Sequence, residues 1–211
     1  MRRQMACCLV AVGVAIFGSG CASMNLSKDL AFEPREPSIA KGISLYASPE
    51  AQAFVVEGSI FGGPPMGRSY RIPVGDALLP NAHHCFASIF QSAEVVRNLT
   101  TSGGGYTVEL DFPAKGIIDI GSTSFSASPV TLSLRARVHA GDGVVVWEKT
   151  VKTTASAKSR WQIAAIIPVF GALGHDTAIV LAAEKSLQQS LDEIRDALLK
   201  NKDIFLNAKV K

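Results

Sequence analysis

The sequence has little excess charge of either sign. Its 211 residues include 21 Lys and Arg against 18 Asp and Glu, which leaves a net charge of +3. So small a charge, without any cluster of Lys and Arg, does not favour a nucleic-acid partner. Apolar residues make up 47% of the chain, which indicates a packed core and argues against disorder. The length is compatible with a single domain.

Long apolar runs, paired cysteines and reaction motifs are also missing. After the N-terminal segment, no apolar run reaches the roughly 18 residues of a membrane-spanning helix. Of the four cysteines, Cys7 and Cys8 lie in that segment, and acylation of Cys21 would leave Cys85 as the only free thiol. A disulfide framework within one chain is therefore excluded. No catalytic constellation is present, so we expect no enzyme and assign no catalytic residue.

The N-terminus has the three parts of a secretory signal. Arg2 and Arg3 form a short positive region, and residues 6–17 form an uninterrupted apolar stretch of the length that such signals use. Residues 18–20 are small, as expected before a cleavage site. The sequence thus predicts a signal peptide over residues 1–20.

Cys21 follows these small residues directly, and this arrangement resembles a bacterial lipobox. Gly18 departs from the pattern, because that position usually holds Leu or another larger apolar residue. The resemblance implies cleavage before Cys21 and a covalent lipid on it. The alternatives are an ordinary signal peptide with a coincidental cysteine, or a spanning anchor. Ala22, not Asp, comes next, which by resemblance to Gram-negative lipoproteins implies an outer-membrane protein with its domain in the periplasm.

The mature chain divides into a tether and a domain. Residues 21–52 are rich in Ser, Pro, Lys and Glu with weak periodicity, and we interpret them as a tether, partly docked through Leu30, Phe32 and Ile43. Strand-like and helix-like patterns begin at Ala53. The sequence therefore predicts an α+β domain over residues 53–211.

Two segments have the periodicity of amphipathic helices. Residues 76–91 place one apolar stripe at helical spacing: Leu78, Ala82, Cys85, Phe86 and Ile89. Residues 178–200 carry a second, longer stripe: Val180, Ala183, Leu187, Leu191, Ile194 and Leu198. Each helix needs an apolar sheet face to cover.

A β-hairpin is the best-defined strand unit. Residues 130–139 alternate between apolar and polar side chains, and Asp142-Gly143 is a favoured turn pair. Counting outward from the turn pairs Arg137 with Glu148, whereas a four-residue loop would bring Arg135 to Glu148. Either register gives Glu148 a cation on the neighbouring strand.

These elements predict an α+β two-layer sandwich with a mostly antiparallel sheet, one face of which carries a short helix and the long C-terminal helix. Their order also resembles a broad group of small envelope lipoproteins, those that assist lipopolysaccharide export and the auxiliary lipoproteins of envelope ABC transporters. Residues 72–75, Ile-Pro-Val-Gly, open the first helix in this comparison. The resemblance implies a non-enzymatic partner in transport or assembly, and no site motif is matched that would transfer a functional residue.

The most unusual stretch is residues 161–173, which are apolar apart from one glutamine and are interrupted by Pro168 and Gly171. One interpretation is a buried crossover that fills an end of the core. The other is an exposed loop that contacts a partner protein or dips into a membrane. Its candidate contact residues are Trp161, Ile166, Ile167 and Phe170, with Arg160 placed to meet phosphate headgroups.

Two sets of polar residues are candidates for a binding site. Arg135, Arg137 and His139 form a basic row on one strand face, which is either a solvated surface balanced by Glu148 or a site for an anionic partner. In His83-His84-Cys85, consecutive helical side chains diverge by about 100°, so the histidines do not converge on one ion, and we assign no metal site.

The sequence therefore favours a lipid-anchored, non-enzymatic binding or assembly accessory of an envelope complex or transport system. Its partners would be the membrane, through the lipid, and an envelope protein, with no cofactor apart from the covalent lipid on Cys21. The alternative is a carrier of a lipid or other amphiphile in a cavity between helix and sheet.

Overall fold

The computed structural model describes residues 22–60, 68–99, 105–118, 129–157 and 168–207. Nine strands and four helices occur in these ranges. In chain order they are β1 (Ala22–Ser23), β2 (Ile39–Ala47), α2 (Pro49–Gln52), β3 (Val56–Ile60), β4 (Arg68–Ile72), α3 (Gly75–Ala87), β5 (Phe90–Val95), β6 (Tyr106–Asp111), β7 (Ile117–Ile118), β8 (Val130–His139), β9 (Val145–Ala155), α4 (Pro168–Lys200) and α5 (Asp203–Asn207).

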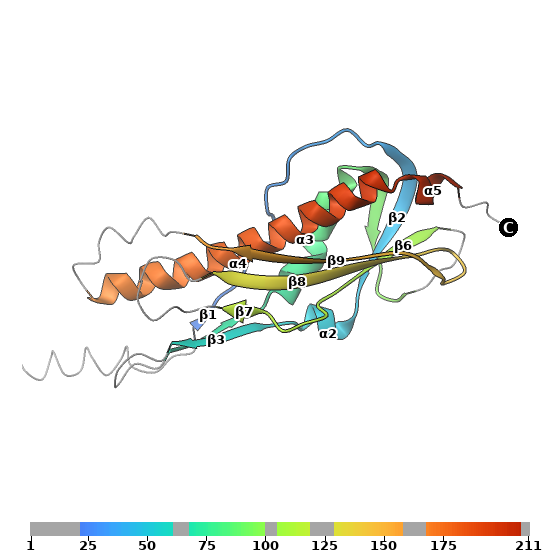
Figure 1. Cartoon of the computed structure of the whole chain (residues 1–211). Helices are drawn as coiled ribbons and strands as arrows, with labels where there is room; N and C mark the ends of the chain where they lie inside the picture. Colours follow the sequence, from blue (N-terminus) through green and yellow to red (C-terminus); the bar gives the residue numbers. More distant parts are fainter. Residues whose placement is uncertain (1–21, 61–67, 100–104, 119–128, 158–167, 208–211) are drawn as a thin grey trace, which may run out of the picture.

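One sheet contains all nine of these strands, and β8 pairs with three of the others (Figure 1). Strand β9 pairs along one edge of β8 for its whole length. The other edge of β8 pairs first with β7 and then with β6. Two arms extend from there: β7 leads to β3, β4 and β1, and β6 leads to β2 and β5.

The predicted α+β class is confirmed, but the sheet is mixed and not mostly antiparallel. Strand β2 runs parallel to both β5 and β6, β1 runs parallel to β4, and β3 runs parallel to β7. The remaining pairs, including β8 with β6 and β9, are antiparallel. The error has a physical source: hairpins are visible locally, whereas parallel pairing joins segments that are far apart in the sequence.

The predicted tether is also wrong for its second half. Residues 39–47 form β2, which lies between β5 and β6 inside the sheet, and residues 49–52 form helix α2. Ile43, Leu45 and Ala47 alternate toward the core and are at most 4% exposed. This alternation covers only five residues, so in the sequence it does not stand out from the polar segment before it.

Helices α3 and α4 contact each other and cover the apolar face of the sheet. Helix α3 packs on β2 and β5, and α4 packs on β8 and β9. Leu45, Val108 and Val138 are paired across β2, β6 and β8, so they lie on this same face, and all three are fully buried. The apolar stripe predicted for 76–91 is buried completely, and that for 178–200 is buried except at Val180, which is partly buried against the core.

The hairpin is confirmed in the first of the two registers. Arg137 pairs with Glu148, and Val138 pairs with Trp147. Gly143 adopts φ 83°, a conformation that glycine reaches without steric cost, and it supplies the tight turn. The pairing shifts register between Val138 and His139, next to the loop, where Val138 pairs with Trp147 and His139 pairs with Val145.

Candidate functional site

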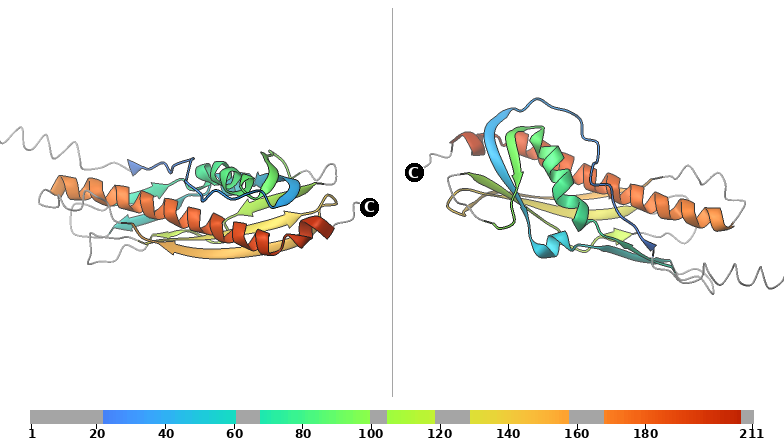
Figure 2. Two further views of the ribbon diagram at one scale, coloured as in Figure 1. Left: turned by 90° about the horizontal axis from the view of Figure 1, so that it is seen from above. Right: turned by 180° about the vertical axis from the view of Figure 1, so that it is seen from behind.

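The chain joins the sheet immediately after the predicted lipidation position. Cys21 itself lies outside the described residues, but Ala22 and Ser23 form β1 and pair with Tyr70 and Arg71 of β4. Strand β1 lies toward the end of the molecule that is opposite to the C-terminus, as both views in Figure 2 show. The predicted lipidation position is thus adjacent in sequence to a paired strand.

Residues 24–38, here called the N-terminal strap, connect β1 to β2 without helix or strand. The strap nevertheless packs on the body. Met24 and Leu26 are buried at 8% and 6% exposure, and Leu30 and Phe32 are partly buried against the core. The predicted docking through Leu30 and Phe32 is confirmed.

Helix α3 holds the strap through Asn81, which is fully buried. Its side-chain oxygen accepts a hydrogen bond from the Leu30 amide at 2.8 Å, and its nitrogen donates to the Ser27 carbonyl at 2.9 Å. His84 Nδ1 also lies 3.0 Å from a carboxylate oxygen of Asp29. The side chain of Asn81 therefore provides hydrogen-bond partners for two backbone groups of a segment that has no helix or strand hydrogen bonds.

Helix α4 holds the strap from the other side with four residues spread along one side of the helix: Glu184, Gln188, Arg195 and Asp196. Glu184 accepts from the Ser27 amide at 2.7 Å, and Gln188 donates to the Ala31 carbonyl. Arg195 donates to the Glu33 carbonyl at 3.3 Å. Asp196 forms an ion pair of 2.8 Å with Arg35, which fixes the far end of the strap.

Arg195 is the charged residue that sequence reasoning missed. It lies outside the apolar stripe predicted for residues 178–200, yet it is only 1% exposed. Its guanidinium lies 2.7 Å from a carboxylate oxygen of Asp192, so the buried positive charge is paired with a negative one. Burial raises the pKa of Asp192, and the attraction of Arg195 opposes that rise. The available signal is spacing, because Arg195 stands four residues after Leu191 of the apolar stripe.

The apolar stretch 161–173 is only partly described. Arg160, Trp161, Ile166 and Ile167 lie outside the described residues, and so does the side chain of Phe170. The backbone from Pro168 onward is helical, so α4 begins ten residues before the predicted start at 178. Proline is accepted in the first turn of a helix, where its missing N–H has no intrahelical partner to bond. Pro168, which interrupts the apolar stretch in the sequence, is therefore the first residue of α4.

The first turns of α4 project beyond the ends of β8 and β9 in both figures, toward the end where β1 lies (Figures 1 and 2). The described residues contain no helix that is both long enough and apolar enough to cross a membrane.

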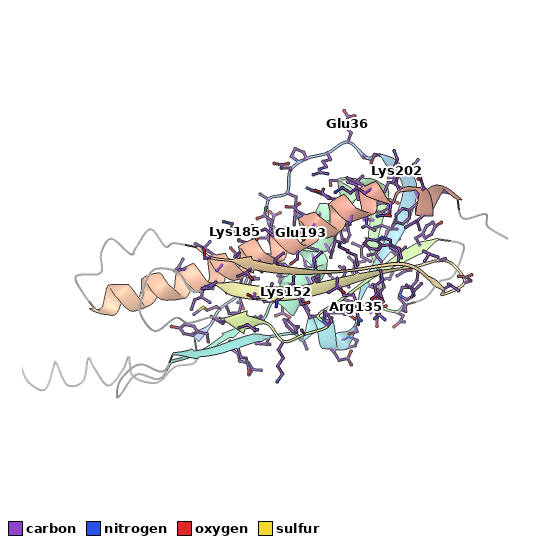
Figure 3. The ribbon with its side chains drawn as sticks, in the orientation of Figure 1. Glu36, Arg135, Lys152, Lys185, Glu193 and Lys202 are labelled. Atoms are coloured by element: carbon purple, nitrogen blue, oxygen red, sulfur yellow. The ribbon has the colours of Figure 1, made fainter. Side chains whose placement is uncertain are left out.

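The basic row of β8 is neutralised within the sheet. Arg135 donates two hydrogen bonds to Asp111, at 3.0 and 2.6 Å, and Arg137 reaches both Glu109 and Asp111 at 2.9 and 3.1 Å. His139 Nε2 is 2.7 Å from Glu109. Figure 3 places Arg135 on the side of β8 away from α4. These contacts leave little net positive charge to attract an anionic partner.

The three residues 83–85 do not converge. Cys85 is fully buried, and burial raises the pKa of its thiol to about 12, which disfavours a nucleophilic thiolate. His84 turns to Asp29 of the strap. Within the described ranges, no group of three His, Cys, Asp or Glu side chains could hold a metal ion.

Two grooves mark the described surface. One, of about 370 Å³, lies between β9 and α4 and is lined by Lys152, Thr153, Thr154, Gln189, Asp192, Glu193 and Asp196. The other, of about 390 Å³, lies between α3 and β5 and is lined by Leu79, Pro80, His83, His84 and Val95. Both are surface features. Beneath α4 the facing Leu132, Leu134 and Leu187 are fully buried, so neither groove enters the helix–sheet interface.

No protein-family model and no curated protein matches the chain. Among solved structures, a Xanthomonas campestris protein of the family DUF330 is 12% identical with a TM-score of 0.49, covering 86% of this chain and 99% of its own. A minor lipoprotein from Acinetobacter baumannii is 10% identical with a TM-score of 0.41, covering 76% of this chain and 95% of its own. Both TM-scores are below 0.5, so these similarities establish neither the fold nor the function of the chain.

Proposed function

We propose that this protein is a lipid-anchored envelope protein, acylated on Cys21, whose domain is a non-enzymatic binding or assembly accessory. In this proposal the anchor lies in the outer membrane and the domain in the periplasm. The partner is an envelope protein, one that belongs to a transport or assembly complex. Anchoring raises the local concentration of the domain beside that partner.

The observation that carries the proposal is the shared position of two features. The chain enters the sheet at β1, one residue after Cys21, and α4 begins at the same end of the molecule (Figure 1). The apolar stretch 161–173 runs into the start of this helix. An anchor and an apolar segment at one end are what a membrane-proximal contact surface requires.

The proposed contact residues remain Trp161, Ile166, Ile167 and Phe170, with Arg160 beside them. Phe170 belongs to the projecting first turns of α4, where the backbone is described. The basic row of Arg135, Arg137 and His139 is a weaker second surface, because its two arginines are already paired with carboxylates.

Site-specific photocrosslinking in the native bacterium tests the proposal. Photoreactive residues at Trp161 and Phe170 should capture one and the same envelope protein, whereas a photoreactive residue at exposed Val144, on the hairpin tip, serves as the control and should not capture it. Capture of lipid alone would contradict the accessory role and support the carrier alternative. If neither Trp161 nor Phe170 captures a protein or a lipid, the result would support the alternative that the apolar stretch is buried in the core.

The double variant Trp161→Ser and Phe170→Ser separates an interface from a core. At an interface the variant should lose partner recovery and keep the free energy of unfolding of the parent within about 0.5 kcal/mol, as surface substitutions do. A core stretch would instead lose several kcal/mol, because burying polar groups in place of two aromatic rings leaves cavities.

A further inference from the structure

The N-terminal strap has more polar contacts than a flexible tether would have. Five backbone groups of residues 27–33 are hydrogen-bonded by side chains of α3 and α4: the amides of Ser27 and Leu30 and the carbonyls of Ser27, Ala31 and Glu33. Arg35 adds an ion pair to Asp196, and Asp29 adds one to His84. A segment without secondary structure needs such partners to be held in one conformation.

The two ends of the strap are fixed as well. At its start, β1 pairs with β4, and Met24 and Leu26 are buried. At its end, the amides of Ser38 and Ile39 both donate to the Ile89 carbonyl, and the chain enters β2. The body is therefore contacted from residue 22 onward, and little free chain separates Cys21 from it.

We propose that the strap clamps the lipidated N-terminus to the domain, so that the end of the molecule carrying β1 lies directly on the bilayer surface. This inference rests on the proposed acylation of Cys21. The occupant of that end is a membrane surface, since the lipid on Cys21 is separated from Ala22 of β1 by one residue step of about 3.8 Å.

Reach distinguishes this arrangement from a tethered domain. A free chain over residues 22–52 would have a root-mean-square span of about 30 Å and an extended reach of about 100 Å. The clamped domain has no such reach, and its partner must lie in the membrane or within the dimensions of the domain beside it. Its orientation is also fixed, with the hairpin tip around Val144 away from the bilayer (Figure 1).

Matched insertions in the full-length acylated protein test the clamp. A flexible Gly/Ser linker of about 20 residues is inserted either directly after Cys21, before β1 and the strap, or between Glu36 and Pro37, after the ion pair of Arg35 with Asp196. Glu36 is exposed at the outermost point of this connection, where an insertion disturbs no contact (Figure 3). In a free tether the two insertions are equivalent, whereas in a clamped strap only the first lengthens the anchor.

The readout is energy transfer from a dye on the protein to acceptor lipids in phosphatidylethanolamine and phosphatidylglycerol vesicles. The dye is placed at Ile117→Cys, which pairs with the start of β8 and so lies at the end of the sheet opposite the hairpin tip, or at Val144→Cys on that tip, both more than half exposed. Native Cys85 is buried and the parent chain serves as the labelling blank. We expect strong transfer from the dye at Ile117 and weak transfer from the dye at Val144. The first insertion adds about 25 Å to the anchor and should remove about half of the transfer from Ile117. The second insertion should leave that transfer unchanged.

Equal transfer from the two dyes, or equal effects of the two insertions, would overturn the clamp. Failure of the underlying proposal gives a different result: the intact mass would lack acyl chains on Cys21, and the protein would not partition into vesicles.

Hydrogen exchange provides the second measurement. The amides of Ser27 and Leu30 should be protected in the acylated protein. Asn81→Ala should remove the protection at Leu30, and Asn201→Ala, whose amide bonds only within its own helix segment, should not.

Discussion

At the scale of single residues, Gly75 shows how closely two helices approach. It is the first residue of α3, and its amide donates to the Phe54 carbonyl at 2.9 Å. A Cβ atom at this position would lie 2.3 Å from the Gln52 carbonyl oxygen and 2.4 Å from that of Ala51. Both obstacles are backbone atoms of α2 and its C-terminus, so a side chain has no rotamer that avoids them.

Gly75→Ala should therefore lower the free energy of unfolding by about 1–3 kcal/mol, because α2 or α3 must shift. Urea unfolding followed by circular dichroism measures the change. The matched control is Gly105→Ala, since a Cβ there meets nothing within 4 Å. An equal loss in both variants would show that the backbone contact with α2 is not the cause.

Cys85 is a second residue whose behaviour follows from burial. In the mature acylated chain it would be the only free thiol. With the pKa of the thiol raised to about 12 from an ordinary 9.0, it should not react with a thiol reagent at pH 8 until the protein unfolds. Because the folded pKa is the higher one, its contribution to stability should be present below about pH 9 and fall as the pH rises toward 12. Rapid labelling of native protein would contradict this burial, and Cys85→Ala isolates the thiol's part of the alkaline loss.

At the scale of elements, strands β6 and β8 are joined by a ladder of alternating charge. Asp111 accepts from both Arg135 and Arg137, and Glu109 contacts both Arg137 and His139. Every contact of the ladder crosses between two paired strands. The sequence predicts Glu148 of β9 as the partner of a β8 arginine, and the register does place Glu148 opposite Arg137, but the ion pairs of Arg137 are with Glu109 and Asp111 of β6.

Asp111→Asn should cost about 1–3 kcal/mol, because two arginines lose a charged acceptor. Glu57→Gln is the control, since Glu57 pairs with Arg71 between β3 and β4 while both side chains are about two-thirds exposed. Such an exposed pair is expected to contribute about 0–1 kcal/mol. Thermal unfolding of the two variants should rank them in that order. The reverse order would show that the β6–β8 ladder is not stabilising.

At the scale of the whole molecule, β2 decides where the domain begins. It is the only described strand that links β5 to the rest of the sheet, and it pairs with β6 on its other edge. A chain that starts at Ala53, the boundary predicted from the sequence, would expose the paired edges and the buried residues of both neighbours.

Such a chain should show no cooperative unfolding transition, whereas a chain from Ala22 should unfold cooperatively. A chain from Ile39, which keeps β2 and lacks only the strap, should be folded but less stable, because the buried Met24 and Leu26 each contribute about 1.5–3 kcal/mol when fully buried. Calorimetry of the three chains makes the comparison. A cooperative transition in the shortest one would restore the tether interpretation.

The sequence by itself determined the elements whose signals are local. The hairpin turn at Gly143, the alternating faces of β8 and the apolar stripes of α3 and α4 were all predicted correctly, because a turn or a helical face is set by residues a few positions apart. The secretory and lipobox-like pattern before Ala22 is also a local signal, and the lipidation that it predicts concerns residues outside the described ranges.

Only the tertiary structure decided which distant segments meet. The parallel pairing of β2 joins strands separated by more than forty residues, and no periodicity reports that. Asn81 and Arg195 are polar in the sequence, yet they are buried because they bind the backbone of the strap. A polar side chain becomes interior when a folded partner satisfies it, and the partner's position is a property of the fold.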